Sequence, residues 1–342
     1  MGAFPFNVTS SDGRARAGVL ATPRGQVRTP AFMPVGTVGT VKGLYLDQVE
    51  ETGADIILGN TYHLMLRPGA DVVAELGGLH RMMDWDGHVL TDSGGYQVFS
   101  LAPKVDDEGA VFRSTYDGST HRLTPEGAVA IQEQLGADIQ MVLDVCAPLP
   151  SSTAVLREAV DRTAAWAARA KAARRHETQA LFGIAQGGTD PALRAESARR
   201  TVDLDFDGYA VGGLSVGESR EDMLPALKAA IDELPGDRPR YLMGVGDPAG
   251  MVEAVGLGID MFDCVLPTRL ARHGTLLTAE GRINLKNARF ARDDRPPDPS
   301  CGCPTCSRWS RGYLRHLLQV AEPTAGRLLT VHNVAWILDL VR

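Results

Sequence analysis

The chain has 342 residues, a net charge of -7 and 44% apolar residues, which are ordinary values for a globular protein with a large core. No apolar run approaches the roughly 20 residues needed to span a bilayer, and residues 1–11 lack the basic-then-apolar order of a signal peptide. These features argue against a membrane protein or a secreted one. The five cysteines are an odd number, and Cys146 and Cys264 stand alone in apolar runs, which favours a reducing compartment, the cytoplasm.

In chain order, residues 12–30 alternate in character around Gly13 and Gly25, which predicts an antiparallel hairpin. Helical segments such as 124–136 and 154–175 then separate short apolar runs. Eight strands in such an alternation predict a (β/α)8 TIM barrel with the hairpin at its bottom, although a doubly wound open sheet would show the same local pattern. The eight predicted strands are 31–35, 55–59, 88–91, 139–143, 180–185, 209–212, 240–245 and 259–262.

Polar residues or glycines stand where these runs stop. In a barrel the carboxyl ends of the strands converge on one face, where active sites of this fold are built. Each residue alone could be a turn residue or a helix cap. Together they predict a site, and they are Asn60, Asp92, Asp144, Gln186, Gly212 with Gly213, Gly244 and Asp263.

The residues at these ends favour glycoside chemistry on a purine-like base. Asp92 and Asp263 suggest a division of labour in which one carboxylate attacks an anomeric carbon and the other moves protons, and spacing does not say which does which. The hydrogen-bonding groups that would read the edge of the base come from Asp144, Gln186 and the Gly212–Leu214 backbone, and Tyr96 and Met243 could sandwich its faces.

Residues 268–332 are too long for a simple loop and contain Cys301, Cys303, Cys306 and His332. Three thiolates and an imidazole suit tetrahedral zinc and leave no position for a catalytic water, so we expect a structural Zn²⁺ site in a small subdomain. The alternative is a surface cysteine cluster that merely oxidises. We divide the chain into a barrel with its hairpin (1–267), this subdomain (268–332) and a C-terminal helix closing on the barrel (333–342).

The same region is basic, with ten Arg or Lys against four Asp or Glu from Arg269 to Arg315. This excess is the footprint expected for a phosphate backbone, although a solvated basic face would look alike. We expect RNA contacts from Arg269, Arg272, Lys286 and Arg289.

After the cysteines, Trp309, Tyr313 and His316 fall at the spacing of one helix face. Helical periodicity alone is equally typical of a stripe that packs on the barrel.

The chain resembles the queuosine-type tRNA-guanine transglycosylases, of the bacterial kind, along nearly its whole length. The resemblance rests on the zinc quartet and on residues 91–97 (TDSGGYQ), 183–188 (GIAQGG), 212–218 (GGLSVGE), 241–246 (YLMGVG) and 258–269. Members of that family are zinc-bearing barrels that remove guanine from the wobble position of tRNAs with GUN anticodons. They insert a 7-deazaguanine through a covalent tRNA–enzyme intermediate, and this chain is expected to do the same as a pentosyltransferase.

Carried over position by position, the resemblance implies that Asp263 is the nucleophile and Asp92 the general acid/base. It also implies that Asp144, Gln186 and Gly213 bind the base, that Leu214 and Ser215 present backbone groups to its 7-substituent, and that Tyr96 and Met243 stack on it. The stripe Trp309, Tyr313 and His316 would lie at a homodimer interface.

Two positions bear on which base is used. Val145 stands where bacterial members usually have a glutamate, and Val216 resembles the bacterial pocket, where eukaryotic enzymes have a glycine that makes room for queuine. A branched side chain in a close-packed pocket excludes a large substituent, which favours 7-aminomethyl-7-deazaguanine over queuine.

Two rival functions belong to other classes of protein. One is a noncatalytic tRNA-binding partner subunit, against which the presence of both Asp92 and Asp263 argues. The second is a barrel metallohydrolase, which would need His or carboxylate ligands at the end of the first strand, where residues 34–37 offer none.

Overall fold

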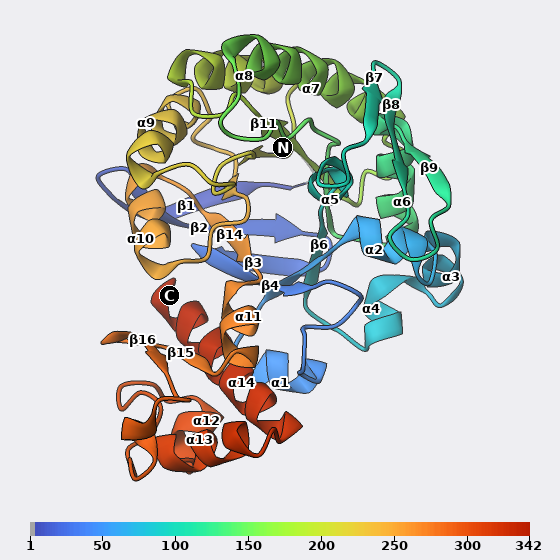
Figure 1. Ribbon diagram of the computed structural model, residues 1–342. Helices are drawn as coiled ribbons and strands as arrows, with labels where there is room; N and C mark the ends of the chain where they lie inside the picture. Colours follow the sequence, from blue (N-terminus) through green and yellow to red (C-terminus); the bar gives the residue numbers. More distant parts are fainter. Residues whose placement is uncertain (1–3) are drawn as a thin grey trace.

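The computed structural model describes residues 4–342, and its centre is a closed barrel of eight parallel strands (Figure 1). Around the barrel the strands follow chain order, and β14 pairs with β4 to close it, Met261 facing Ala31 and Asp263 facing Met33. The predicted (β/α)8 barrel is therefore confirmed. Its strands are β4 (Ala31–Gly36), β5 (Ile56–Gly59), β6 (His88–Thr91), β10 (Ile139–Met141), β11 (Ala180–Ala185), β12 (Gly208–Val211), β13 (Arg240–Leu242) and β14 (Met261–Cys264).

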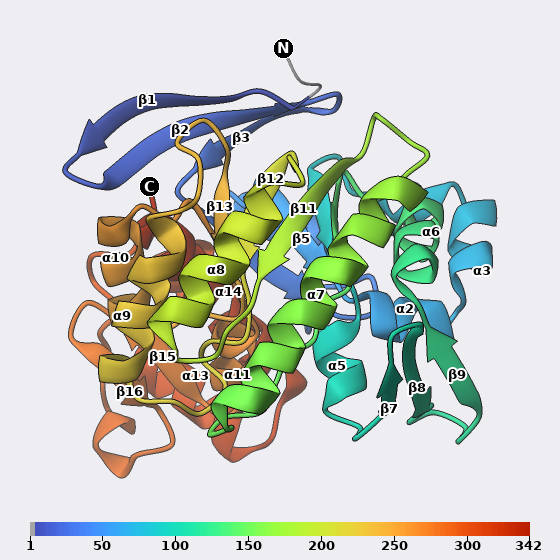
Figure 2. The same ribbon diagram turned by 90° about the horizontal axis from the view of Figure 1, so that it is seen from above.

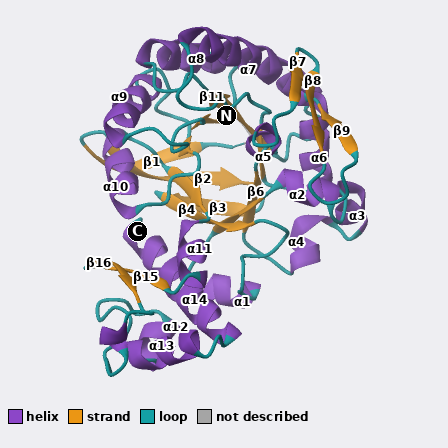
Figure 3. Cartoon of the chain, viewed as in Figure 1, coloured by secondary structure: helices purple, strands orange, loops and turns teal. Residues whose placement is uncertain are grey.

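The barrel strands are buried on both faces, which is why their sequences are continuous apolar runs rather than alternating ones. Every residue of β5 and of β11 is buried. Helices form a ring around them (Figure 3). No helix within residues 4–342 is both long and apolar enough to cross a membrane. The helices of this part are α1 (Leu46–Glu51), α2 (Thr61–Leu66), α3 (Ala70–Glu75), α4 (Gly78–Met83), α5 (Gly95–Phe99), α6 (Pro125–Leu135), α7 (Thr153–Ala173), α8 (Pro191–Val202), α9 (Arg220–Ile231) and α10 (Pro248–Leu257).

The N-terminal element is a three-stranded antiparallel sheet, so the prediction of a single hairpin over 12–30 was wrong in extent. Its strands are β1 (Phe6–Asp12), β2 (Ala15–Thr22) and β3 (Gly25–Thr29). Only the first residue of β1 is buried, so this edge strand lacks the apolar alternation that reveals a strand in sequence. The sheet covers the end of the barrel where the strands begin (Figure 2). Arg16 on β2 binds Asp260 there through a buried ion pair.

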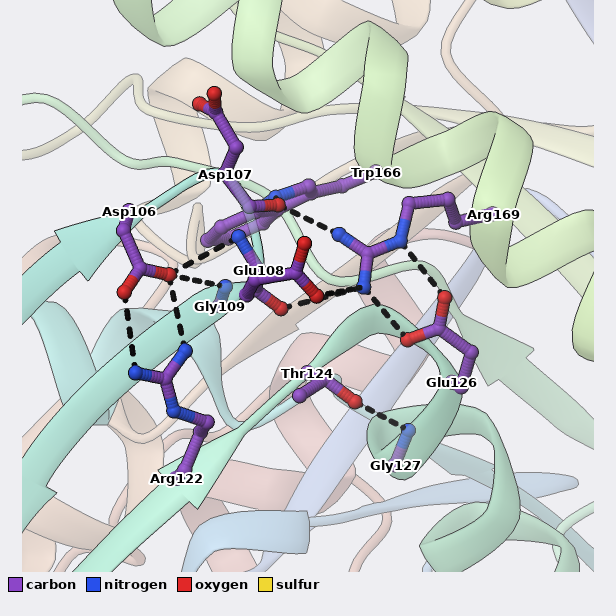
Figure 4. A network of polar contacts seen from close by, with 10 residues as sticks. All are labelled: Asp106, Asp107, Glu108, Gly109, Arg122, Thr124, Glu126, Gly127, Trp166 and Arg169. Atoms are coloured by element: carbon purple, nitrogen blue, oxygen red, sulfur yellow. Dashed lines mark hydrogen bonds and ion pairs between the residues drawn. The ribbon is translucent and has the colours of Figure 1, made fainter.

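A second antiparallel sheet, which the sequence analysis missed, is inserted between α5 and α6. It consists of β7 (Lys104–Asp106), β8 (Gly109–Arg113) and β9 (Thr120–Leu123). Arg169 on α7 donates to the carbonyls of Asp107 and Glu108 in the turn between β7 and β8 (Figure 4). It also donates to both carboxylate oxygens of Glu126 on α6. The sheet is thus fixed to the two helices behind it.

The C-terminal region has an apolar core of its own, built from residues such as Leu276, Phe290 and Leu314. Its long last helix packs on this core through Leu329 and on the barrel core through Val334, so it joins the two. The boundary placed at 332/333 falls inside that helix, and the three-part division stays a prediction. The elements are α11 (Leu266–Arg272), β15 (Thr275–Thr278), β16 (Gly281–Asn284), the 3-10 helix η1 (Ala288–Phe290), α12 (Pro304–Arg308), α13 (Arg311–Gln319) and α14 (Pro323–Leu340).

The predicted aromatic stripe does not lie on one helix. Ser310 accepts a hydrogen bond from the Tyr313 N–H and caps α13, so Trp309 precedes the helix and packs partly buried against the C-terminal core. Tyr313 and His316 are on α13 and exposed. A serine cap inside the apparent stripe is the feature that the spacing argument overlooked.

Candidate active site

The predicted polar residues meet at the carboxyl ends of the barrel strands. Asp92 follows β6, Asp263 lies in β14, and Asp144 follows β10. The three carboxyls are close enough that the charge of Asp92 raises the pKa of both others, although burial is the larger cause in each case. Asp144 is buried and the other two acids are half-buried. Three acids gathered with so little water around them are costly, and such places are typical of catalytic sites.

Asp92 accepts hydrogen bonds from four donors. Its Oδ1 accepts from the backbone N–H of Thr61 at 2.8 Å and of Gly94 at 3.1 Å, and its Oδ2 accepts from the amides of Asn60 at 2.5 Å and Gln97 at 3.3 Å. Burial raises the pKa of the Asp92 carboxyl, and these hydrogen bonds oppose that rise. A fixed carboxyl with a raised pKa suits a group that gives and takes a proton.

Asp263 is held through one oxygen only. The Tyr241 hydroxyl donates to Oδ1 at 2.6 Å and the Gly244 N–H donates to the same atom at 2.7 Å. Among the described residues no donor binds Oδ2. Burial raises the pKa of Asp263, and the two hydrogen bonds lower it. An ionised carboxylate anchored at one oxygen can attack with the other.

Beside these acids, Asp144 and Gln186 form a hydrogen-bonded pair. The Gln186 amide donates to Oδ2 of Asp144 at 2.5 Å, and burial raises the pKa of Asp144 to about 6. Gly213 has φ +65°, and a Cβ there would lie 2.3 Å from the Gln186 side-chain oxygen, so the position strongly favours glycine. A carboxylate, an amide and bare backbone thus lie together, and groups of this kind can hydrogen-bond to the edge of a purine-like base.

The loop after β12 contains an acid that the sequence analysis left without a role. Glu218 accepts from the N–H groups of both Ser215 and Val216, and Ser215 has φ +61°. Leu214 is buried and Ser215 is exposed. The sequence did contain a sign of this role, because Glu218 follows Ser215 by three residues and a side chain at that spacing can bind the backbone of its own loop.

Two further residues were missed because only the fold shows their roles. Tyr241 reaches Asp263 from the neighbouring strand, and Arg194 on α8 lies completely buried beneath the loops that contain Gln186 and Gly213. The two predicted stacking residues differ in burial: Tyr96 on α5 is 61% exposed, whereas Met243 after β13 is half-buried.

Val145 and its neighbour Cys146 face different surroundings. Val145 is buried in an apolar cluster with α7 side chains such as Leu156, and its N–H binds the Thr163 hydroxyl. Cys146 is half-buried, and burial first, then the charge of Asp144, raises the pKa of its thiol to about 12.

The cysteine cluster also assembles. The donor atoms of Cys301, Cys303, Cys306 and His332 all lie within 4.8 Å of one another. Nε2 of His332 is 2.7 Å from the Leu277 carbonyl, which can only accept, so Nε2 donates and Nδ1 keeps its lone pair toward the sulfurs. The group could therefore bind a metal ion, and its soft donors fit zinc.

The four predicted RNA-contacting residues are all exposed, and none forms an ion pair with a described residue. Arg269 and Arg272 are on α11, which begins three residues after Asp263, and Lys286 and Arg289 follow β16. They therefore extend from the rim of the site over the C-terminal region.

Comparison with known proteins agrees with this geometry. The family model described as queuine tRNA-ribosyltransferase matches residues 11–342. The chain belongs to the queuine tRNA-ribosyltransferase family. It is accordingly a pentosyltransferase, as the sequence resemblance predicted.

Proteins named queuine tRNA-ribosyltransferase are similar to it over nearly their whole length. That of Herpetosiphon aurantiacus is 53% identical, over 100% of this chain and 88% of its own length. Those of Desulforudis audaxviator and Caulobacter vibrioides are 56% and 55% identical, each over 98% of this chain and 92% of the relative.

Proposed function

We propose that this chain exchanges guanine at the wobble position of tRNAs with GUN anticodons (those for Asp, Asn, His and Tyr) for 7-aminomethyl-7-deazaguanine in queuosine biosynthesis. The observation that supports it best is the pairing of Asp263, anchored at one oxygen, with Asp92 close by at the same end of the barrel.

In the proposed reaction the free Oδ2 of Asp263 attacks C1′ of the ribose. The bond between C1′ and the base nitrogen breaks, its electron pair leaves with guanine, and Asp92 supplies the proton that guanine takes up. The incoming base then gives its proton to Asp92 and attacks C1′, which releases the Asp263 carboxylate. One glycosidic bond replaces another, so no energy source is consumed.

Asp144, Gln186 and Gly213 would bind the hydrogen-bonding edge of either base, Tyr96 and Met243 would stack on it, and Leu214 and Ser215 would face the 7-substituent. The half-buried Val216 beside them supports the smaller aminomethyl group over queuine. Val145 points into an apolar cluster and offers no support to either base.

The test is incubation with unmodified tRNA and either base, followed by mass spectrometry of the tRNA nucleosides. Incorporation of 7-aminomethyl-7-deazaguanine supports the proposal. Incorporation of queuine alone would make the chain a queuine-inserting salvage enzyme. Tight tRNA binding with no exchange of any base would make it a noncatalytic partner subunit.

For the metal centre we propose one structural Zn²⁺ held by Cys301, Cys303, Cys306 and His332. Four protein ligands would close its coordination sphere, so it would stabilise the basic C-terminal region and take no part in the exchange. The reduced cysteines that such a site needs agree with the cytoplasm, where we place the protein.

We also propose a homodimer in which the C-terminal region of one subunit orients the tRNA for the other. Tyr313, 44% exposed, and His316 on α13 support this face, with Trp309 beside them at the start of the helix. A monomeric mass at micromolar concentration in sedimentation would overturn it, and Tyr313→Ala should weaken the dimer without altering the fold.

A further inference from the structure

Arg194 is a buried cation with no acid as its partner. It is 0% exposed, and among the described residues no carboxylate lies within ion-pair distance of it. Burial lowers its pKa to about 10, so it stays charged at neutral pH. An unpaired buried charge is costly, which points to a role that only a guanidinium performs here.

All the partners of Arg194 are backbone carbonyls at the ends of two neighbouring barrel strands. Its Nε donates to Gly188 at 2.7 Å, and Nη1 donates to Ala185 at 3.0 Å and to Gly212 at 2.6 Å. Nη2 donates to Gly213 at 3.1 Å. The planar five-donor fork of arginine can span four acceptors, whereas the single ammonium of lysine cannot.

Two of these hydrogen bonds determine the orientation of the peptide groups on either side of Gly213, and therefore the direction of their N–H groups. In a trans peptide the C=O and the following N–H point in opposite directions. Because the carbonyls of Gly212 and Gly213 face Arg194, the N–H groups of Gly213 and Leu214 face away from it. Gly213 itself lies against the Gln186 side chain, beside which the base is proposed to bind.

The same helix also holds Gln186. Ser197, one turn further along α8, accepts a hydrogen bond from the Gln186 N–H at 2.9 Å. One buried face of α8 therefore anchors the backbone of both segments that meet at the pocket.

We propose that Arg194 is a positioning residue for base recognition, which aims the N–H groups of Gly213 and Leu214 at the base and polarises their peptides. This rests on the proposed function, because it requires the purine to bind beside Gln186. A guanidinium hydrogen-bonded to a carbonyl strengthens the N–H on the other side of the peptide. Donors fixed in this way stabilise negative charge that develops on a departing purine.

The test is incorporation of labelled guanine into tRNA by wild type, Arg194→Lys and a matched control, Arg199→Lys, on the exposed side of the same helix. For Arg194→Lys we expect KM for guanine to rise about tenfold or more and kcat to fall, because charge-assisted hydrogen bonds are lost. KM for tRNA should stay within about twofold. The control should match wild type in all three.

A purely structural role would lower the melting temperature and the active fraction without separating the two KM values. An unchanged KM for guanine, or an equal rise in both KM values, would overturn the inference. If Arg194→Lys does not fold, Arg194→Gln, which removes the charge and most of the donors, replaces it, and an unchanged KM for guanine in that variant would equally contradict the proposal. Absence of guanine exchange by wild type would overturn the proposed function itself, and this inference with it.

Discussion

Tyr241 donates its hydroxyl hydrogen to Oδ1 of Asp263 at 2.6 Å, across the pair of adjacent strands β13 and β14. Together with the Gly244 N–H, this bond orients the carboxylate and leaves Oδ2 without a donor from the described residues. Burial raises the pKa of the Tyr241 hydroxyl well above its ordinary value. The hydroxyl therefore stays protonated, and remains a donor, at every pH at which the enzyme is active.

Tyr241→Phe should reduce guanine exchange about tenfold or more, because a hydrogen bond to a charged group is lost. It should also move the acid limb of the pH–rate profile to higher pH. The hydroxyl lowers the pKa of Asp263, and the nucleophile must be ionised, so its removal demands a higher pH. Tyr209→Phe, a buried tyrosine of the neighbouring strand whose hydroxyl binds the Phe206 N–H, is the control and should leave the profile unchanged. An unshifted profile in Tyr241→Phe would show that the bond does not tune Asp263.

Asp144→Asn should stabilise the protein at neutral pH and weaken base binding. The folded-state pKa of Asp144, about 6, lies above the ordinary 3.8, so the unfolded chain loses its proton first and the wild type loses stability as pH rises between these values. The free energy of unfolding of Asp144→Asn relative to wild type should therefore rise by roughly 2 kcal/mol between about pH 4 and about pH 7.5. Urea unfolding at both pH values measures it.

The comparison for this test is Asp117→Asn, because hydrogen bonding by Ser119 lowers the pKa of the exposed Asp117 to about 2. It should show no such gain. If the free energy of unfolding of Asp144→Asn relative to wild type is the same at the two pH values, burial does not raise the pKa of the Asp144 carboxyl.

Val145→Glu should destabilise the protein rather than change its choice of base. The side chain of Val145 packs in a buried apolar cluster, where a carboxylate has no partner to compensate for lost water. We expect a loss of about 2–4 kcal/mol in the free energy of unfolding, with the ratio of kcat/KM between 7-aminomethyl-7-deazaguanine and guanine changed less than about threefold. A larger change in that ratio would give position 145 a role in base recognition.

Cys303→Ser, or removal of the metal by a chelator, should weaken the folding of the C-terminal region and tRNA binding, and should leave the binding of the base unchanged. Metal analysis should find about one zinc per wild-type chain and less in the variant. The melting temperature of Cys303→Ser should fall and its KM for tRNA should rise, whereas its KM for the base should stay the same. Cys264→Ser, outside the cluster, should keep its zinc. Normal tRNA affinity in metal-free folded protein would show that the cluster does not support tRNA binding by the C-terminal region.

The parts of the fold and of the site that could be predicted from the sequence are those that leave a local pattern in it. The barrel strands are buried on both faces and are visible as apolar runs, and Asp92 and Asp263 stand at their ends, as sequence placed them. β1, β7 and β9 lack such runs, and β8 has only a short one, residues 110–112. Arg194 looks like any arginine of an Ala- and Arg-containing helix. Its burial is a consequence of how α8 packs, and no local pattern encodes that.

The aromatic stripe shows the limit of periodicity most clearly. Trp309, Tyr313 and His316 have helical spacing, yet Ser310 starts a new helix between the first and the second. Spacing counts residues but does not detect a break that a single side-chain cap introduces.

The central claim, that Asp263 attacks the ribose, is tested most directly by trapping. Wild type, Asp263→Ala and Asp92→Ala are each incubated with guanine-containing tRNA and analysed by denaturing electrophoresis. A protein–tRNA adduct that survives denaturation in wild type and is absent from Asp263→Ala is the predicted result. Base exchange or an adduct retained by Asp263→Ala would contradict the assignment of Asp263 as nucleophile.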